Sequence, residues 1–173
     1  MRKKGFLTLL LMIPMWVQAE DFTITIDRKK DAAARGAGTR SQVATSQQWV
    51  GEIKIENRTF KPSAEIELRY IIFVKRQELR QSAGMDQIEQ VKGTVKVGSL
   101  QGREKASFLT SEVTLRQQAV KGNWILVDNN GKEEGKRKAE DAVTGVWVKL
   151  FAGETEVADY ANPSTVKAKN KWE

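Results

Sequence analysis

The 173-residue sequence contains no histidine and no cysteine. Without them the chain cannot form Ser-His-Asp or Cys-His nucleophilic systems, His- or Cys-based zinc sites, or disulfides. Carboxylates remain, and Glu65 and Glu67 would lie about 7 Å apart on one strand face, near the spacing of glycosidase carboxylates. Their alternation is typical of a solvated face, and a hydrolase would need two carboxylates that converge in a cleft. We therefore predict that the protein is not an enzyme and uses no cofactor or metal.

Long apolar runs are also missing, apart from Gly5–Trp16 near the N-terminus. This run is shorter than the ~20 residues that a membrane-spanning helix needs. Basic residues Arg2–Lys4 precede it, and Val17-Gln18-Ala19 ends it in the small-x-small pattern of a leader-peptidase site. The pattern predicts a signal peptide over residues 1–19, cleaved after Ala19. The remaining chain is then exported to the periplasm or the outer cell surface and does not span a membrane.

A second interpretation of the N-terminus is a prepilin-type leader. The segment Lys4–Leu10 resembles the Lys-Gly-Phe-Thr-Leu start of type IV prepilins. However, Leu10 stands where such pilins carry a glutamate, and Pro14 interrupts the apolar segment too early for a pilin stalk helix. The ordinary signal peptide therefore fits better.

Charge gives little indication of a nucleic-acid partner. The formal net charge is +7, and three of the positive charges lie in Arg2–Lys4, which the predicted cleavage removes. A nucleic-acid interface needs a denser basic face than the rest of the chain offers. We therefore predict no nucleic-acid binding.

Apolar and polar residues alternate over Ser63–Lys75, which then becomes apolar on both faces. Such a pattern predicts a central β-strand that enters a core. Seven further segments have strand character: Phe22–Ile26, Trp49–Glu56, Val91–Val97, Ala106–Leu115, Trp124–Val127, Val143–Phe151 and Glu154–Tyr160. No amphipathic helix is evident. The sequence predicts an all-β fold, a two-sheet antiparallel Ig-like (immunoglobulin-like) β-sandwich of about seven to eight strands, with a closed barrel as the alternative.

The predicted organisation has four parts. Residues 1–19 form the signal peptide, 20–48 a first strand and flexible arm, 49–164 the Ig-like β-sandwich, and 165–173 a polar tail. The arm, Asp31–Gln48, is rich in Ala, Gly, Ser, Thr and Gln and has no sustained period. Because sandwich edges can accept added strands, this arm or Phe22–Ile26 could be exchanged in a homo-oligomer.

Tryptophans supply the candidate contact residues. Trp49 and Trp147 lie in apolar strands and are predicted to belong to the core. Trp124, at a strand start, and Trp172, in the tail, are the predicted ligand or partner contacts. If both were exposed and coplanar on one surface, the chain would be a carbohydrate-binding β-sandwich module, which is the alternative function.

Four segments of the sequence follow one another in an order that resembles a known group of proteins. Ile53-x-Ile55-x-Asn57, then Leu68-x-Tyr70-Ile-Ile-Phe73, then Gly145–Phe151 and Glu156–Pro163 follow one another in the sequence. This order resembles the small secreted immunoglobulin-like β-sandwich proteins of verrucomicrobial and planctomycete-type bacteria, some of which are encoded with type IV pilus-like genes. The resemblance implies a non-enzymatic exported cell-envelope structural or interaction module, a type IV pilus-associated accessory protein. It also implies a protein partner among pilus or outer-membrane components, and it supplies no catalytic residues.

Overall fold

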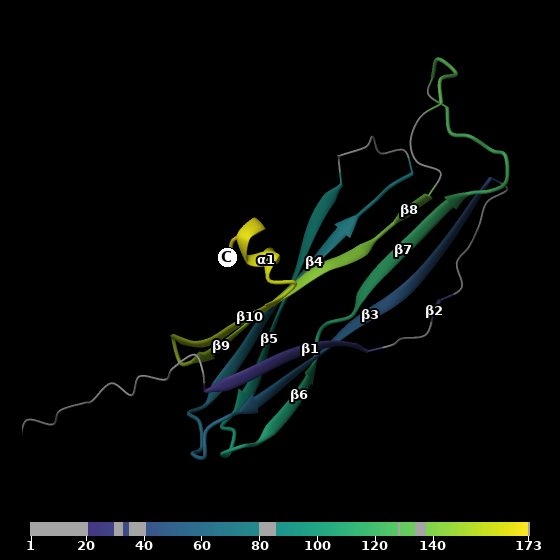
Figure 1. The fold of residues 1–173 in the computed structure, drawn as a ribbon. Coiled ribbons are helices and arrows are strands. Elements are labelled where there is room, and N and C mark those ends of the chain that lie inside the picture. The colour runs from purple at the N-terminus through teal and green to yellow at the C-terminus, as the bar shows by residue number, and fades with distance from the viewer. Residues whose placement is uncertain are drawn as a thin grey trace, which may run out of the picture.

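The computed structural model describes residues 21–29, 33–34, 41–79, 86–127, 129–133 and 138–172. The predicted signal peptide lies outside these residues, as do residues 31, 32 and 35–40 of the predicted arm. The described chain forms two antiparallel sheets that pack face to face, with one short helix on the outside (Figure 1). The predicted all-β antiparallel sandwich is therefore confirmed.

The first sheet follows the order β1-β3-β7-β8, with β2 and β6 also paired to β3. Its strands are β1 (Phe22–Lys29), β2 (Ala33–Ala34), β3 (Gln42–Asn57), β6 (Lys105–Leu109), β7 (Val113–Val120) and β8 (Lys138–Glu140). The second sheet follows the order β10-β9-β4-β5. Its strands are β4 (Ile66–Arg76), β5 (Gln87–Gly98), β9 (Ala142–Ala152) and β10 (Thr155–Asn162).

Strand β4 is central, as its sequence predicts. It pairs with β5 on one side and with β9 on the other. Alternate residues of β4 point between the sheets into the main core, where Leu68 and Ile72 are fully buried. Ile71 and Phe73 face the other way and are buried too. The apolar end of the segment therefore needs cover on both faces of the sheet.

The predicted polar tail supplies that cover. Residues Thr165–Lys169 form helix α1, whose Val166 is buried against the outer face of the second sheet. Gly145 of β9 leaves the space, because a β-carbon there would collide with a methyl group of Val166. Val166 and Trp172, the two large apolar residues of this segment, are six positions apart and give no helical period, so the sequence does not reveal this packing.

Strand β3 differs from its prediction. It begins at Gln42, so the boundary expected at Trp49 between arm and sandwich falls inside one continuous 16-residue strand. The first half is Gln-Val-Ala-Thr-Ser-Gln-Gln, which lacks apolar alternation. Pairing with β7 holds it instead, including a 3.0 Å hydrogen bond from Thr114 Oγ1 to Gln48 Oε1.

The segment Ala106–Leu115, predicted as one strand, is two strands. The ladder is interrupted after Leu109, and Thr110 turns towards β3. Its Oγ1 accepts a 2.9 Å hydrogen bond from the Gly51 N–H, while its own N–H donates to the Gly51 carbonyl. These two bonds replace ladder pairing, and strand β7 resumes at Val113.

The prediction of a strand at Trp124–Val127 is wrong. The segment is a connection after β7, and its only described pairing is an isolated bridge between Val127 and Glu133. Among the described residues no strand pairs with Trp124–Leu126, and β8 pairs with β7 over Gln117–Ala119. The apolar side chains of Trp124, Ile125 and Val127 are left exposed.

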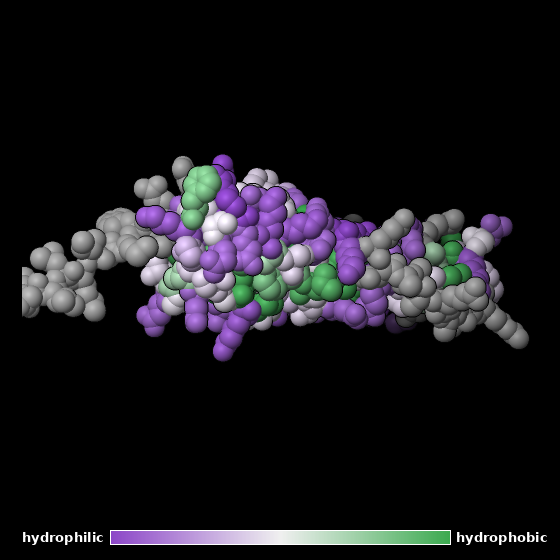
Figure 2. All heavy atoms as spheres, turned by 90° about the horizontal axis from the view of Figure 1, so that it is seen from below, coloured by the Kyte–Doolittle hydropathy of each residue, from purple (hydrophilic) through white to green (hydrophobic). Residues whose placement is uncertain are grey.

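The sandwich is elongated, and its longest strands run along most of its length (Figure 1). Seen from below, it is largely polar, with an apolar stripe along the long axis (Figure 2). Within the described ranges, no helix has the length and apolar character to cross a membrane.

Candidate functional site

One end of the sandwich is closed by two connections, residues 58–65 between β3 and β4 and residues 99–104 between β5 and β6. We call these two connections the tip. They are joined by backbone hydrogen bonds from Ser63 N–H to the Leu100 carbonyl, at 2.8 Å, and from Arg103 N–H to the Thr59 carbonyl, at 3.0 Å. Ser63 Oγ also accepts from the Leu100 N–H at 2.9 Å. The two connections therefore form one unit.

Asn57, the last residue of β3, organises the tip from beneath. Its side chain is buried, and Nδ2 lies 2.8 Å from the Lys61 carbonyl oxygen and 3.1 Å from those of both Leu100 and Gln101. Its Oδ1 accepts from Thr59 N–H at 3.0 Å and from Thr59 Oγ1 at 2.8 Å. One amide thus satisfies polar groups from both connections, which fixes their shape.

The tip presents an exposed aromatic ring. Phe60 is 84% exposed, although exposed large apolar side chains are costly to hydrate. The guanidinium carbon of Arg103 lies 4.4 Å from the centroid of the Phe60 ring, a cation–π distance. Arg103 has a positive φ of 64°, which is strained for a residue with a β-carbon. Gly102 allows this turn to sit directly on the Phe60 backbone, where a β-carbon would collide.

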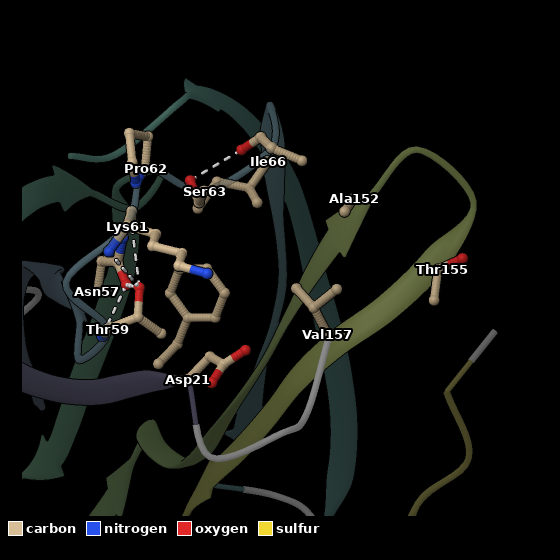
Figure 3. Close-up of a pocket in the computed structure, with 12 residues that line it drawn as sticks. Asp21, Asn57, Thr59, Lys61, Pro62, Ser63, Ile66, Ala152, Thr155 and Val157 are labelled. Carbon is tan, nitrogen blue, oxygen red and sulfur yellow. Dashed lines mark hydrogen bonds between the residues drawn. The ribbon is translucent and has the colours of Figure 1, made fainter. Parts of the chain in front are cut away.

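A pocket of about 330 Å³ opens beside the tip (Figure 3). Its apolar wall includes Phe22, Ile66 and Val157, which come from β1, β4 and β10. The volume is at the lower end of the range for small-ligand sites. In Figure 3 the Lys61 side chain extends across the pocket, and the Asp21 carboxylate lies at the opposite rim. The site is therefore an apolar hollow with a charged margin.

Positive charge predominates on the tip itself. Arg58, Lys61 and Arg103 are all exposed, and within the described part of the chain none of them forms an ion pair with a carboxylate. Two acidic residues belong to the same connections: Glu104 accepts a hydrogen bond from the backbone N–H of Gln101, and Glu65 is exposed next to β4. By contrast, the neighbouring Lys105 pairs with Glu56 at 3.3 Å.

The predicted contact residues lie elsewhere and apart from each other. Trp124 is 60% exposed in the connection after β7 of the first sheet. Trp172 packs edge-on against Trp147, with ring centroids 5.2 Å apart, on the outer face of the second sheet. The structure does not bring them together as one platform. Trp49 and Trp147 are buried, which confirms their assignment to the core.

The acidic pair considered from the sequence does not converge in a cleft. Glu67 accepts a 2.6 Å hydrogen bond from Arg69 Nε on the outer face of β4, and Glu65 is exposed before that strand. Among the described residues, no three acidic side chains gather closely enough to hold a metal ion. Sequence reasoning missed the tip, because Phe60 and Arg103 lie in separate turns without periodicity. The Asn-x-Thr turn at Asn57 is the one signal that could have indicated it.

Comparisons with known proteins give no family. No family model matches the chain, and no curated protein matches it. Solved structures with some likeness include a Northeast Structural Genomics Consortium target, SoR45, at 7% identity and a TM-score of 0.35, covering 83% of this chain and 86% of the target. A protein from Akkermansia muciniphila is 10% identical, with a TM-score of 0.31, covering 88% of this chain and 77% of that protein.

A β-glucosidase from Listeria innocua, solved in complex with gluconolactone, is 8% identical with a TM-score of 0.28. The match covers 92% of this chain but only 19% of the β-glucosidase. Identities and TM-scores at this level carry no argument about role. The function is therefore argued from the residues of the tip.

Proposed function

We propose that this chain is an exported, non-catalytic cell-envelope module that binds a protein partner through the tip. The observation that carries the proposal is the pair formed by Phe60 and Arg103. The Phe60 ring lies in solvent beneath the Arg103 guanidinium and contributes nothing to the core. The strained backbone of Arg103 also costs stability. Aromatic residues and arginine are also the residue types enriched at the centres of protein interfaces.

The rigidity of the tip supports a binding role. Asn57 and the backbone bonds between the two connections hold Phe60 and Arg103 in place before any partner arrives. A surface fixed in advance loses little conformational entropy on binding, which favours affinity. The pocket beside the tip offers a complementary hollow for a side chain of the partner.

Export and envelope location rest on the N-terminal pattern of Arg2–Lys4, the apolar run and Ala19. The resemblance to secreted immunoglobulin-like sandwiches supports a finer proposal, that the module is a type IV pilus-associated accessory protein. Its partner would then be a pilus or outer-membrane component. Homo-oligomerisation by strand addition is a further proposal, and strand β1 pairs with β3 of its own chain.

The test is cross-linking and affinity capture from envelope extracts, with the wild-type chain compared with Phe60→Ala and Arg103→Gly. We expect each variant to lower recovery of one and the same protein by at least tenfold. Arg103→Gly is a suitable change because glycine adopts a positive φ without strain.

The matched control is Ile88→Ala, which removes a half-exposed apolar side chain from the end of β5 opposite to the tip. The control should capture the partner as well as the wild type does. If the tip variants and the control recover the same proteins in the same amounts, the tip is not the binding surface. Recovery of glycans that a simple sugar displaces would favour the carbohydrate-binding alternative.

A further inference from the structure

The charge around Phe60 indicates what kind of partner the tip would accept. Arg103 lies over the ring, and Arg58 and Lys61 belong to the same connection as Phe60. None of the three cations has a carboxylate partner in the described residues. Elsewhere on the sandwich, many cations are paired, as Lys54 is with Asp27 at 2.8 Å. Exposed cations that lack an internal partner can contribute charge-assisted hydrogen bonds to a ligand, and guanidinium groups suit carboxylates best.

The pocket indicates a second requirement. Phe22, Ile66 and Val157 give its wall an apolar character that suits an aliphatic or aromatic side chain. A sugar would instead need several polar partners for its hydroxyl groups and an open aromatic face. One face of Phe60 is already covered by Arg103 at 4.4 Å. A lipid surface would need a broad exposed apolar area, whereas this hollow has a volume of only about 330 Å³.

We propose that the tip binds an acidic peptide segment of its partner, with an apolar side chain of that segment seated in the pocket. Carboxylates of the segment contact Arg103, Arg58 and Lys61, and the apolar side chain lies between Phe22 and Val157. Lys61, which extends across the pocket in Figure 3, is placed to contact a carboxylate next to the buried side chain. This inference rests on the proposed function and adds the chemistry of the partner.

The acidic rim limits the sequences that fit. Asp21 lines the pocket opposite Lys61, and exposed Glu65 is the last residue of the connection that carries Lys61. A segment with carboxylates on all sides would be repelled there. We therefore expect acidic residues on one side of the apolar anchor, towards Arg58 and Arg103.

The experiment is selection from a displayed library of random twelve-residue peptides against the purified protein, with Arg103→Gly as the counter-selection target. Enriched peptides should combine Asp or Glu with one large apolar residue. Their affinity should fall at least tenfold with Arg103→Gly, with Phe60→Ala, and with Ala64→Phe, which places a large side chain at the pocket margin. Lys96→Ala, an exposed lysine on β5, is the charge control and should bind as the wild type does.

Three outcomes overturn the inference, and two of them concern the peptides. Either no peptide is enriched over the counter-selection, or the enriched peptides are basic or lack an apolar residue. Heparin and vesicles of anionic phospholipid are tested in parallel, and tip-dependent binding to either without peptide binding also overturns it. If envelope capture still depends on Phe60 while acidic peptides do not bind, the proposed function survives and only this inference fails. If capture is independent of Phe60 as well, both fail.

Discussion

Arg76 Nη1 lies 2.9 Å from Asp141 Oδ2, and this ion pair joins the two sheets of the sandwich. Arg76 ends β4 of the second sheet, whereas Asp141 separates β8 of the first sheet from β9 of the second. The carboxylate is buried and also accepts hydrogen bonds from the backbone N–H groups of Gln77 and Arg116, at 3.1 Å each. One side chain therefore anchors three segments where the chain crosses between sheets.

We expect Asp141→Asn to lower the free energy of unfolding by about 3 kcal/mol, because it removes the buried negative charge between Arg76 and Arg116 and replaces one accepting oxygen with an NH2 donor. Urea denaturation followed by tryptophan fluorescence measures the change. Glu89→Gln is the matched control, since Glu89 pairs with the same Arg76 from a half-exposed position. That change should cost less than about 1 kcal/mol. Equal costs for the two variants would contradict a special role for the buried carboxylate.

The same site predicts a pH dependence. Burial alone raises the pKa of Asp141, but the hydrogen bonds from Gln77, Arg116 and Arg76 outweigh it and hold the pKa below its ordinary value of 3.8. The unfolded chain therefore binds the proton more readily than the folded one. This contribution to stability is complete above the ordinary pKa and is lost as the pH falls through the lower folded pKa.

Urea titrations of wild type and Asp141→Asn between about pH 7 and about pH 2 test this dependence. The difference in unfolding free energy should stay constant at neutral pH and shrink below about pH 4. If the difference in unfolding free energy stays the same at the lowest pH, the charge of Asp141 is not what stabilises the point where the chain passes between the sheets.

A second inter-sheet contact is made by Tyr70 of β4. Its hydroxyl oxygen accepts a 2.7 Å hydrogen bond from the Ser111 N–H, between β6 and β7. The ring passes over Gly93 of β5, where a β-carbon would collide with it. We expect Tyr70→Phe to cost about 1 kcal/mol through the lost hydrogen bond. Gly93→Ala should cost more, because the whole ring must move, and thermal unfolding should rank the two in that order.

The sequence predicted the parts of the fold in which one strand carries its own pattern. Alternation in β4 identified the central strand, and the apolar segment Val143–Phe151 identified β9. Both signals are local, because side-chain direction alternates along a strand and a buried strand is rich in apolar residues. The first half of β3 lacks apolar alternation, so nothing local marked it as strand.

The tip could not be predicted for a related reason. Phe60 and Arg103 are 43 positions apart, and only the packing of two turns places one above the other. An isolated phenylalanine in a turn is equally compatible with burial. Trp124 shows the reverse case, since its apolar neighbours predicted a strand and the connection leaves them exposed.

Asn57→Ala tests whether one buried amide organises the tip. The change leaves three carbonyl oxygens and the Thr59 N–H without their side-chain partner, so we expect a loss of about 3 kcal/mol. Amide hydrogen exchange should rise most at Arg103 and Leu100, whose N–H groups bridge the two connections. Asn123→Ala, at an exposed turn, is the control and should leave exchange at the tip unchanged. If the amide exchange rates rose equally across both sheets, the variant would be destabilised as a whole and the tip would not be affected specifically.

The fold also constrains where processing of the N-terminus can occur. The Asp21 carbonyl accepts a 2.7 Å hydrogen bond from the Arg58 N–H, so Asp21 is held against the tip. Cleavage after Ala19 would leave this contact intact, and intact-mass measurement of protein from the envelope fraction should give a chain that begins at Glu20. A prepilin-type leader would instead keep the apolar segment on the chain and give a heavier product. Replacing Ala19 with Asp should block the predicted cleavage and hold the protein in its precursor form, whereas Ala37→Asp, within the arm, should not.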